Sequence, residues 1–224
     1  MPEIQMTKRT LLGGLAMGSL GTALLSTGGT AFAEDAKLPD SIGKVDMAEA
    51  LKPGPLPEIT EGDENAPVKI IEYYSLTCPH CENFQKVTYP AIKKDYIDTG
   101  KVYYIFREFP FDPRAMAGFM LARCAPNGKY LPFVDLMFSQ QRTWATAEDG
   151  SAAMLQMAKL AGFTQESFQA CLTDQKLLDD VNTIRDRAEK EFGVNATPTF
   201  LINGEKYAGD MPVDTMSALI NSML

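Results

Sequence analysis

Two cysteines separated by two residues lie where a predicted strand meets a predicted helix, and this junction limits the possible folds more than any other feature. The strand is the β-branched and aromatic run 68–75, whose pattern is typical of a strand buried on both faces of a central or parallel sheet. The motif Cys78-Pro79-His80-Cys81 follows, and Pro79 suits the first position of a helix. This region therefore predicts a strand–helix unit of an α/β fold.

The rest of the chain predicts a small sheet that is interrupted by a block of helices. Four further segments carry strand or helix patterns, in this order: 102–106 (strand), 113–192 (helical tract), 199–202 with 206–207 (hairpin) and 213–223 (helix). Turn residues divide the tract into four or five helices, and Asp174 suits the N-cap of the last one. A simple crossover needs only about a dozen residues. The fold class is therefore α/β, with a helical domain inserted between the second and third strands.

The first 33 residues have the pattern of an export signal. The positive pair Lys8-Arg9 precedes the apolar stretch 11–25, and an Ala-x-Ala cleavage site ends at Ala33. The stretch has 15 residues, whereas a membrane-spanning helix needs about 20. We therefore expect a cleavable signal peptide over 1–33 rather than an anchor, and an exported protein in a compartment where thiols tend to pair.

Composition limits the partners of the chain. Residues 34–65 are polar and rich in proline, which predicts an extended lead-in with one short helix near 41–51. The formal net charge of the whole chain is −8, and no run of five or six basic residues occurs. A nucleic-acid backbone demands a basic face, so we expect no nucleic-acid partner.

The position of Cys78 at the start of a helix predicts an unusually acidic thiol. Unsatisfied N–H groups and the helix dipole stabilise an anion there, so we expect the pKa of Cys78 to fall below its ordinary value of about 8.5. His80 can bring a positive charge or a donor toward the same sulfur, while the helix shields Cys81. A stabilised Cys78 thiolate favours the reduced protein, so the Cys78–Cys81 disulfide becomes oxidising and is donated to substrate thiols through a mixed disulfide.

Other uses of a single Cys-x-x-Cys motif fit this sequence less well. A structural zinc site usually needs a second pair of ligands, but His80 is the only histidine and lies within the motif. A c-type haem site needs histidine where this chain has Glu82. Transport of Cu(I) on the two thiolates is a less favoured alternative, because no methionine pair adjoins the motif. A non-catalytic binding protein would need neither cysteine. We expect no cofactor and no metal ion.

Three features occur together along the chain: a strand ending Glu72-Tyr73-Tyr74-Ser75, the Cys-Pro-His-Cys motif, and Thr197-Pro198 before a later strand. This combination resembles the DsbA-like, thioredoxin-fold thiol-disulfide oxidoreductases of the bacterial periplasm, over about residues 65–222. The resemblance implies a thioredoxin-like domain made of 66–112 and 193–224, into which the helical domain 113–192 is inserted.

The same resemblance implies roles for three further residues. Pro198 would be a cis-proline beside the sulfurs, and Thr197 would offer its backbone to an extended substrate. Glu72 matches a buried acid of the family, since a buried carboxyl has a raised pKa and can exchange a proton with Cys81. A salt bridge at a sheet edge is the alternative for Glu72. The expected partners are reduced exported proteins and a membrane redox protein that reoxidises the chain, and we expect a monomer.

The residue before the proline separates two activities within the resemblance. The best-known oxidases carry valine there, whereas Thr197 is closer to the isomerase and reductase branch. Disulfide isomerases of this group have a dimerisation domain ahead of the redox fold, for which residues 34–65 are too few. We therefore predict an oxidase, with isomerase or reductase activity as the alternative.

Cys124 and Cys171 both fall in the helical tract, 47 positions apart. In an oxidising compartment we expect a second, structural disulfide between them, with two separate buried thiols as the alternative. Four apolar residues are candidates either for a rim around the sulfurs or for the core: Tyr73, Leu76, Phe111 and Phe200.

Overall fold

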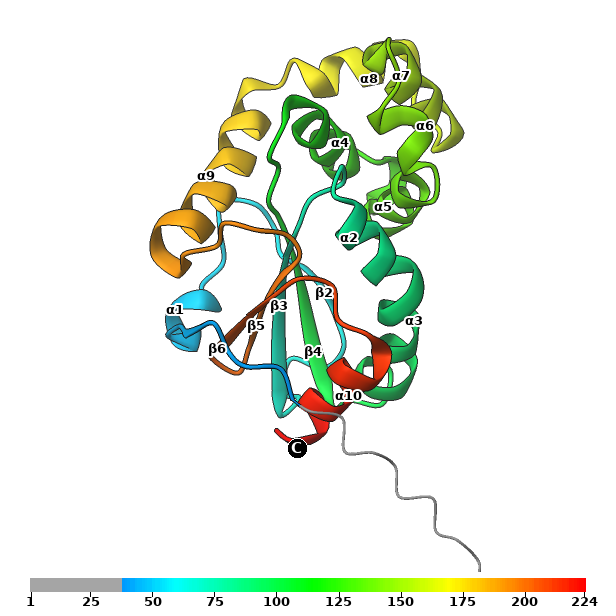
Figure 1. Cartoon of the computed structure of the whole chain (residues 1–224). Coiled ribbons are helices and arrows are strands. Elements are labelled where there is room, and N and C mark those ends of the chain that lie inside the picture. The colour runs from blue at the N-terminus through cyan, green and yellow to red at the C-terminus, as the bar shows by residue number, and fades with distance from the viewer. Residues whose placement is uncertain (1–37) are drawn as a thin grey trace, which may run out of the picture. The chain divides into compact units, whose positions relative to one another are not determined.

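The computed structural model describes residues 38–224, so the predicted signal peptide and the first residues of the lead-in lie outside the described part. Its strands are β1 (Gly43–Lys44), β2 (Ile59–Glu61), β3 (Val68–Tyr74), β4 (Val102–Glu108), β5 (Thr199–Ile202) and β6 (Glu205–Ala208). They form one sheet in the order β1-β6-β5-β3-β4-β2 (Figure 1). β3 is parallel to β4 and antiparallel to β5. Because β3 has neighbours on both sides, it is a central strand, as its sequence predicts.

The helices lie in two groups. Those before and after the inserted block are α1 (Met47–Ala50), α2 (Pro79–Asn83), α3 (Tyr89–Ile92) and α10 (Val213–Asn221). The π-helical segments η1 (Phe84–Thr88) and η2 (Lys93–Ile97) join α2 and α3 into one helical run. The run ends just before Gly100, whose φ of 73° is open to glycine but costly for other residues.

The block between β4 and β5 contains α4 (Pro113–Arg123), α5 (Tyr130–Ser139), α6 (Gln141–Ala145), α7 (Gly150–Leu160), α8 (Gln165–Leu172) and α9 (Gln175–Phe192), with the 3₁₀ turn η3 (Pro126–Gly128). These are six α-helices rather than four or five, because α5 and α6 separate at Gln140, where no glycine or proline marks a break. In Figure 1 the block lies beyond one end of the sheet, and α9 returns toward it. No helix within residues 38–224 is long and apolar enough to cross a membrane.

Side chains of β3 alternate between the two faces of the sheet. Ile70 and Tyr74 join the larger core, on the side of α2, α3 and α10, whereas Ile71 and Tyr73 join the smaller core under α1 and α9. Glu72 has the parity of Ile70 and Tyr74. Its carboxylate is therefore directed to the α2 side, where the cysteine motif lies.

Both edge strands of the sheet come from the segment before β3. β1 pairs with β6 and β2 pairs with β4, so this segment is integrated into the sheet, whereas the sequence predicted an extended lead-in with one short helix and no strand over 34–65. Two- and three-residue strands among prolines are too short to show an alternating pattern, which is why they were not predicted. The predicted short helix corresponds to α1.

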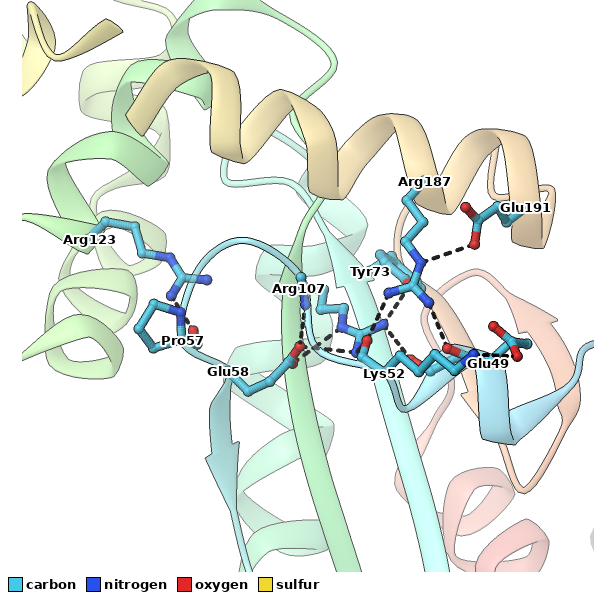
Figure 2. Close-up of polar contacts among 11 residues, drawn as sticks. Glu49, Lys52, Pro57, Glu58, Tyr73, Arg107, Arg123, Arg187 and Glu191 are labelled. Atoms are coloured by element: carbon cyan, nitrogen blue, oxygen red, sulfur yellow. Dashed lines mark hydrogen bonds and ion pairs between the residues drawn. The ribbon is translucent and has the colours of Figure 1, made fainter. Parts of the chain in front are cut away.

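Arg107 on β4 anchors this segment to the sheet (Figure 2). Its side chain is 4% exposed and donates hydrogen bonds to the carbonyl groups of Ala50 and Lys52 and to the hydroxyl group of Tyr73. Its guanidinium group also forms an ion pair with the carboxylate of Glu58 at 3.1 Å. These contacts give the buried guanidinium group hydrogen-bond partners and a counter-charge. Without them, its burial would cost free energy of folding.

Two arginines of the helical block bind the same segment (Figure 2). Arg187 on α9 donates to the carbonyl groups of Glu49 and Lys52, and Arg123 on α4 donates to that of Pro57. We call Arg107, Arg123 and Arg187 the arginine clamp. Because its members belong to the sheet and to the first and last helices of the block, the clamp ties the block to the sheet through one segment.

Candidate active site

Three loops meet at the edge of the sheet where the cysteine motif lies. β3 and β4 are parallel and end at the same edge, and β5, antiparallel to β3, begins there. The segments 75–78, 109–112 and 194–198 are therefore neighbours, although they are far apart in the sequence.

Cys78 is the N-cap residue of α2, and Pro79 occupies its first turn. The Cys78 sulfur is half-buried and lies 3.2 Å from the carbonyl oxygen of Thr197, which can accept its S–H. The peptide bond between Thr197 and Pro198 is cis. The structure thus brings together the cysteine motif and the Thr-Pro pair that the resemblance singled out. Cys78 and Cys81 are both free thiols.

The surroundings shift the pKa values of the two thiols in opposite directions. The pKa of Cys78 is lowered to about 5, chiefly because the Cys81 thiol donates a hydrogen bond to its sulfur. The Thr197 side chain and the backbone N–H groups of Cys81 and His80 lower it further, while burial opposes them. Burial raises the pKa of Cys81 well above its ordinary value, and its hydrogen bond to Cys78 adds to this. At neutral pH the pair therefore holds one thiolate, on Cys78, and one thiol.

Thr197 influences the Cys78 sulfur through its backbone and its side chain. Its carbonyl oxygen suits the neutral thiol, which donates. Its buried hydroxyl group has no hydrogen-bond partner among the described residues, and the Thr197 side chain lowers the pKa of Cys78 less than the Cys81 thiol does. A hydroxyl donor beside the sulfur stabilises the thiolate. The predicted lowering of the Cys78 pKa thus comes from neighbouring side chains as well as from the helix N-terminus.

Glu72 lies behind the cysteine pair in the centre of the sheet. Its side chain is buried, and its carboxylate accepts a 2.8 Å hydrogen bond from the hydroxyl group of Tyr104 on β4. Burial raises the pKa of Glu72 to about 8, the charge of Cys78 adds to the rise, and Tyr104 opposes it. The charge of Glu72 also raises the pKa of Cys81, so the carboxyl and the buried thiol are electrostatically coupled. The partner seen here is a neutral hydroxyl group, not the cation of the alternative salt bridge.

The imidazole of His80 is exposed and directed to another partner. Its Nδ1 atom lies 3.1 Å from Oδ1 of Asp210, whose other carboxylate oxygen accepts a 2.8 Å hydrogen bond from Asn83. His80 lowers the pKa of Cys78 through its backbone N–H. This differs from the prediction that the ring brings a charge or donor toward the Cys78 sulfur. Asp210 follows β6, and its approach to His80 depends on the tertiary fold.

Gln141 connects the helical block to the motif. It is buried on α6, and its amide group donates to the carbonyl oxygens of Leu76 at 2.8 Å and of Cys78 at 3.0 Å. It thereby satisfies the carbonyl group of Leu76 and is a second donor to that of Cys78, which also accepts from the backbone N–H of Glu82. No sequence pattern indicated this role, because a single glutamine in a polar stretch is ordinary.

The remaining candidates separate into core and surface. Tyr73, Leu76 and Phe200 are buried, whereas Phe111 is 56% exposed. Cys124 and Cys171 are joined by a disulfide in the helical block. Within residues 38–224, no group of three or more histidine, cysteine, aspartate or glutamate side chains is arranged to hold a metal ion.

A cysteine pair at a helix N-terminus, a cis-proline beside it and a mixed central sheet define a thioredoxin-fold thiol protein. The chain belongs to the thioredoxin family, since the family model described as Thioredoxin matches residues 56–222. Its similarity to a DsbA structure assigns it to the DsbA-like branch. The crystal structure of Wolbachia pipientis alpha-DsbA1 is 33% identical, with a TM-score of 0.70 over 78% of this chain and 94% of that one. The predicted thioredoxin-like fold with an inserted helical part is confirmed.

Several curated relatives are similar over the same region. A Rickettsia bellii protein, named as a protein-disulfide oxidoreductase, is 29% identical over 73% of this chain and 63% of its own length. A Rickettsia felis protein with the same kind of name is 30% identical over 73% of this chain and 59% of its own length. The chain thus spans about three fifths of these relatives. A Bacillus cereus protein, named as disulfide bond formation protein D, is 30% identical over 73% of this chain and 77% of that protein.

Proposed function

We propose that the protein is a thiol-disulfide oxidoreductase that donates a Cys78–Cys81 disulfide to reduced exported proteins. The observation that carries this proposal is the opposite shift of the two pKa values, lowered to about 5 for Cys78 and raised for Cys81. A protein that stabilises the Cys78 thiolate favours its own reduced form, so its disulfide is a strong oxidant.

The reaction consists of two thiol–disulfide exchanges. A substrate thiolate attacks the Cys78 sulfur, a bond forms between the two sulfurs, and the Cys78–Cys81 bond breaks with its electron pair leaving on Cys81. A second substrate thiolate then attacks the substrate sulfur of this mixed disulfide and expels Cys78 as a thiolate. The substrate loses two electrons and the cysteine pair gains them. The second step is favourable because Cys78 is stable as a thiolate.

Glu72 supplies the proton that the departing Cys81 needs. A carboxyl group with a pKa of about 8 is largely protonated at neutral pH, and its charge is coupled to Cys81. Protonation of Cys81 prevents its return to the Cys78 sulfur. Tyr104 holds the carboxyl group in place through its 2.8 Å hydrogen bond.

Substrate, location and organisation complete the proposal. The Thr197 backbone, beside cis-Pro198, offers hydrogen bonds to an extended substrate segment. Residues 1–33 direct the chain to the periplasm as a cleavable signal, and a membrane redox protein reoxidises the cysteine pair of the monomer. Residues 66–112 and 193–224 form the redox domain, with 113–192 inserted.

The Cys124–Cys171 disulfide stabilises the inserted block in this proposal. It joins residues 47 positions apart, and a loop of this length corresponds to about 4 kcal/mol in the chain-entropy account. Mass spectrometry of the alkylated protein without reductant tests it. We expect this pair to resist alkylation, and two labelled thiols at these positions would exclude the disulfide.

The deciding experiment measures the pKa of Cys78 and the reduction potential of the pair together. We expect a lowered pKa for Cys78 and a reduction potential for the pair well above that of cytosolic reductants. We also expect rapid oxidation of a reduced unfolded protein. A potential of about −270 mV would instead assign a reductase. Isomerase or reductase activity is the second candidate, because position 197 is threonine rather than the valine of the best-known oxidases. Refolding of a protein with scrambled disulfides distinguishes the isomerase.

A further inference from the structure

Asp210 is an acidic residue outside the cysteine motif whose carboxylate binds two residues of α2. Its Oδ1 atom lies 3.1 Å from Nδ1 of His80, and its Oδ2 atom accepts a 2.8 Å hydrogen bond from the side-chain amide of Asn83. His80 and Asn83 are three positions apart, so they lie on the same face of the helix. The carboxylate therefore binds the imidazole and is itself fixed by a second contact one turn further along.

The loop that carries Asp210 is attached to both sides of the active site. Before Asp210, the backbone N–H of Gly209 donates a 2.9 Å hydrogen bond to the carbonyl oxygen of Pro198. After it, the carbonyl oxygen of Met211 accepts a 2.6 Å hydrogen bond from the hydroxyl group of Thr88, a buried residue. Because the backbone is bound on both sides of Asp210, its carboxylate has a preorganised position.

Asp210 and His80 form an ion pair, and within residues 38–224 neither of them pairs with any other charged side chain. Lys86, a basic residue on the same helical run, is paired with Glu82. The Asp210 side chain is 27% exposed, compared with 68% for that of His80. Since Asp210 is the more buried and the more firmly bound partner, it determines where the imidazole lies.

An imidazole bound at this place does not act on the Cys78 sulfur. His80 lowers the pKa of Cys78 through its backbone N–H, while Nδ1 of its ring is directed to Asp210. A histidine ring that approached the sulfur would stabilise the thiolate further, by a hydrogen bond or by a positive charge. The reduced protein therefore lacks a stabilising contact that a released ring would supply.

We propose that Asp210 is a positioning residue that holds the His80 imidazole away from the Cys78 sulfur and thereby limits the oxidising strength of the Cys78–Cys81 disulfide. The inference rests on the proposed function and assigns a residue that tunes the same site. Each additional partner of the thiolate favours the reduced protein and so makes the disulfide a stronger oxidant. Removal of the Asp210 carboxylate should therefore increase the oxidising strength of the pair.

The test compares the equilibrium of the cysteine pair with glutathione in the wild-type protein and in variants. We expect Asp210→Ala to shift the equilibrium constant about threefold toward the reduced protein, equivalent to about 15 mV, because an exposed imidazole is partly screened by water. Asp210→Asn should shift it less, since its side-chain oxygen can still accept from Nδ1. The matched control is Asp214→Ala, which removes an exposed carboxylate from the first turn of α10 and should leave the equilibrium unchanged.

The same substitutions in a His80→Ala background separate positioning from direct charge repulsion. Without the imidazole, Asp210→Ala should not change the equilibrium, because the inference assigns the effect of Asp210 to the ring. Equal shifts in both backgrounds would mean that the carboxylate repels the thiolate directly, and would overturn the inference. A shift toward the oxidised protein in Asp210→Ala would also overturn it, since Asp210 would then direct the ring toward the sulfur. An unchanged equilibrium in Asp210→Ala has the same consequence.

A second readout follows the ring itself. His80 is the only histidine of the chain, so its ring signals in an NMR spectrum are identified at once. In the wild-type protein these signals should differ little between the oxidised and reduced forms, whereas in Asp210→Ala they should respond to the state of Cys78. Equal responses in the two proteins overturn the inference.

Failure of the proposed function gives a different result. A wild-type potential of about −270 mV would exclude the disulfide donor. A shift in Asp210→Ala that depends on His80 would still support the positioning role in that case.

Discussion

The hydroxyl group of Tyr104 and the carboxylate of Glu72 lie 2.8 Å apart on adjacent parallel strands, in the buried layer behind the cysteine pair. This hydrogen bond lowers the pKa of Glu72, whereas burial raises it, and the balance gives a value of about 8. The carboxyl group is therefore poised to exchange protons near neutral pH. The following predictions depend on this arrangement and its neighbours.

Glu72→Gln should slow the oxidation of dithiol substrates at pH 7 by at least about tenfold, because glutamine cannot give a proton to the departing Cys81. Stopped-flow measurement of the exchange rate tests this. Tyr104→Phe is the matched control, since it keeps the carboxyl group. Loss of the Tyr104 hydrogen bond should raise the pKa of Glu72 further. The alkaline limb of the rate measured against pH should therefore move to higher pH. A Glu72→Gln protein with the wild-type rate would exclude the proton-transfer role.

Cys81→Ala should raise the pKa of Cys78, because the Cys81 thiol is the largest cause of its lowering. Cys81→Ser should raise it less, since a hydroxyl group can still donate. His80→Ala is the control that tests the observed geometry: the backbone N–H of residue 80 remains, so we expect a smaller change. Thiolate absorbance in the ultraviolet, measured against pH, gives the three values. Equal values for wild type and Cys81→Ala would contradict the assignment.

The reduced protein should show two opposing dependences of stability on pH. The pKa of Cys78 is lowered to about 5 by folding, so its contribution to the free energy of unfolding is lost as the pH falls toward 5. The pKa of Glu72 is raised from 4.5 to about 8, so its contribution is present in acid and is lost as the pH rises through 8.

These two groups can be separated by urea unfolding between pH 5 and 8. In reduced Glu72→Gln only the Cys78 contribution remains, and the free energy of unfolding should rise with pH. In the oxidised wild-type protein Cys78 does not ionise, and the free energy should fall over the same range. A flat profile for reduced Glu72→Gln would show that folding does not lower the pKa of Cys78.

Gln141→Leu should lower the free energy of unfolding by about 1–3 kcal/mol, because the carbonyl group of Leu76 loses its donor and that of Cys78 keeps only the backbone N–H of Glu82. Gln140→Leu is the matched control at the adjacent, exposed position. Denaturant titration of both variants measures the difference. Equal stabilities would mean that water replaces the amide group without cost.

Arg107→Met should lower the free energy of unfolding by about 2–4 kcal/mol, since Glu58 and the carbonyl group of Ala50 lose their partner, while the carbonyl group of Lys52 keeps Arg187. Arg142→Met, at an exposed position on α6, should change it by less than about 0.5 kcal/mol. Chemical unfolding of the two variants tests the arginine clamp. The clamp would have no energetic role if both variants matched the wild type.

The sequence predicted the parts of the fold and site that rest on local patterns. The buried run 68–75, the cysteine motif at a helix start and the Asp174 cap are each determined by neighbouring residues, and the structure has β3, α2 and α9 at these places. The cis bond before Pro198 came from family resemblance, because a proline alone does not determine its isomer.

Contacts across long sequence separations were not predictable in this way. Asp210 and Gln141 each lie more than 60 positions from the motif residues they bind. The edge strands β1 and β2 are too short to show periodicity, and their pairing depends on where β6 and β4 lie. A single sequence contains no signal for such partners, since each residue type is ordinary in its local context.

The pairing of β1 with β6 has a consequence for the order of events during biosynthesis. Residues 43–44 leave the ribosome early, but their partners are residues 205–206. At common translation rates this gap corresponds to roughly ten to thirty seconds. For that time β1 has no neighbouring strand to pair with, although β2 of the same segment can already pair with β4, so the pairing of β1 completes the sheet only after nearly all other parts have been made.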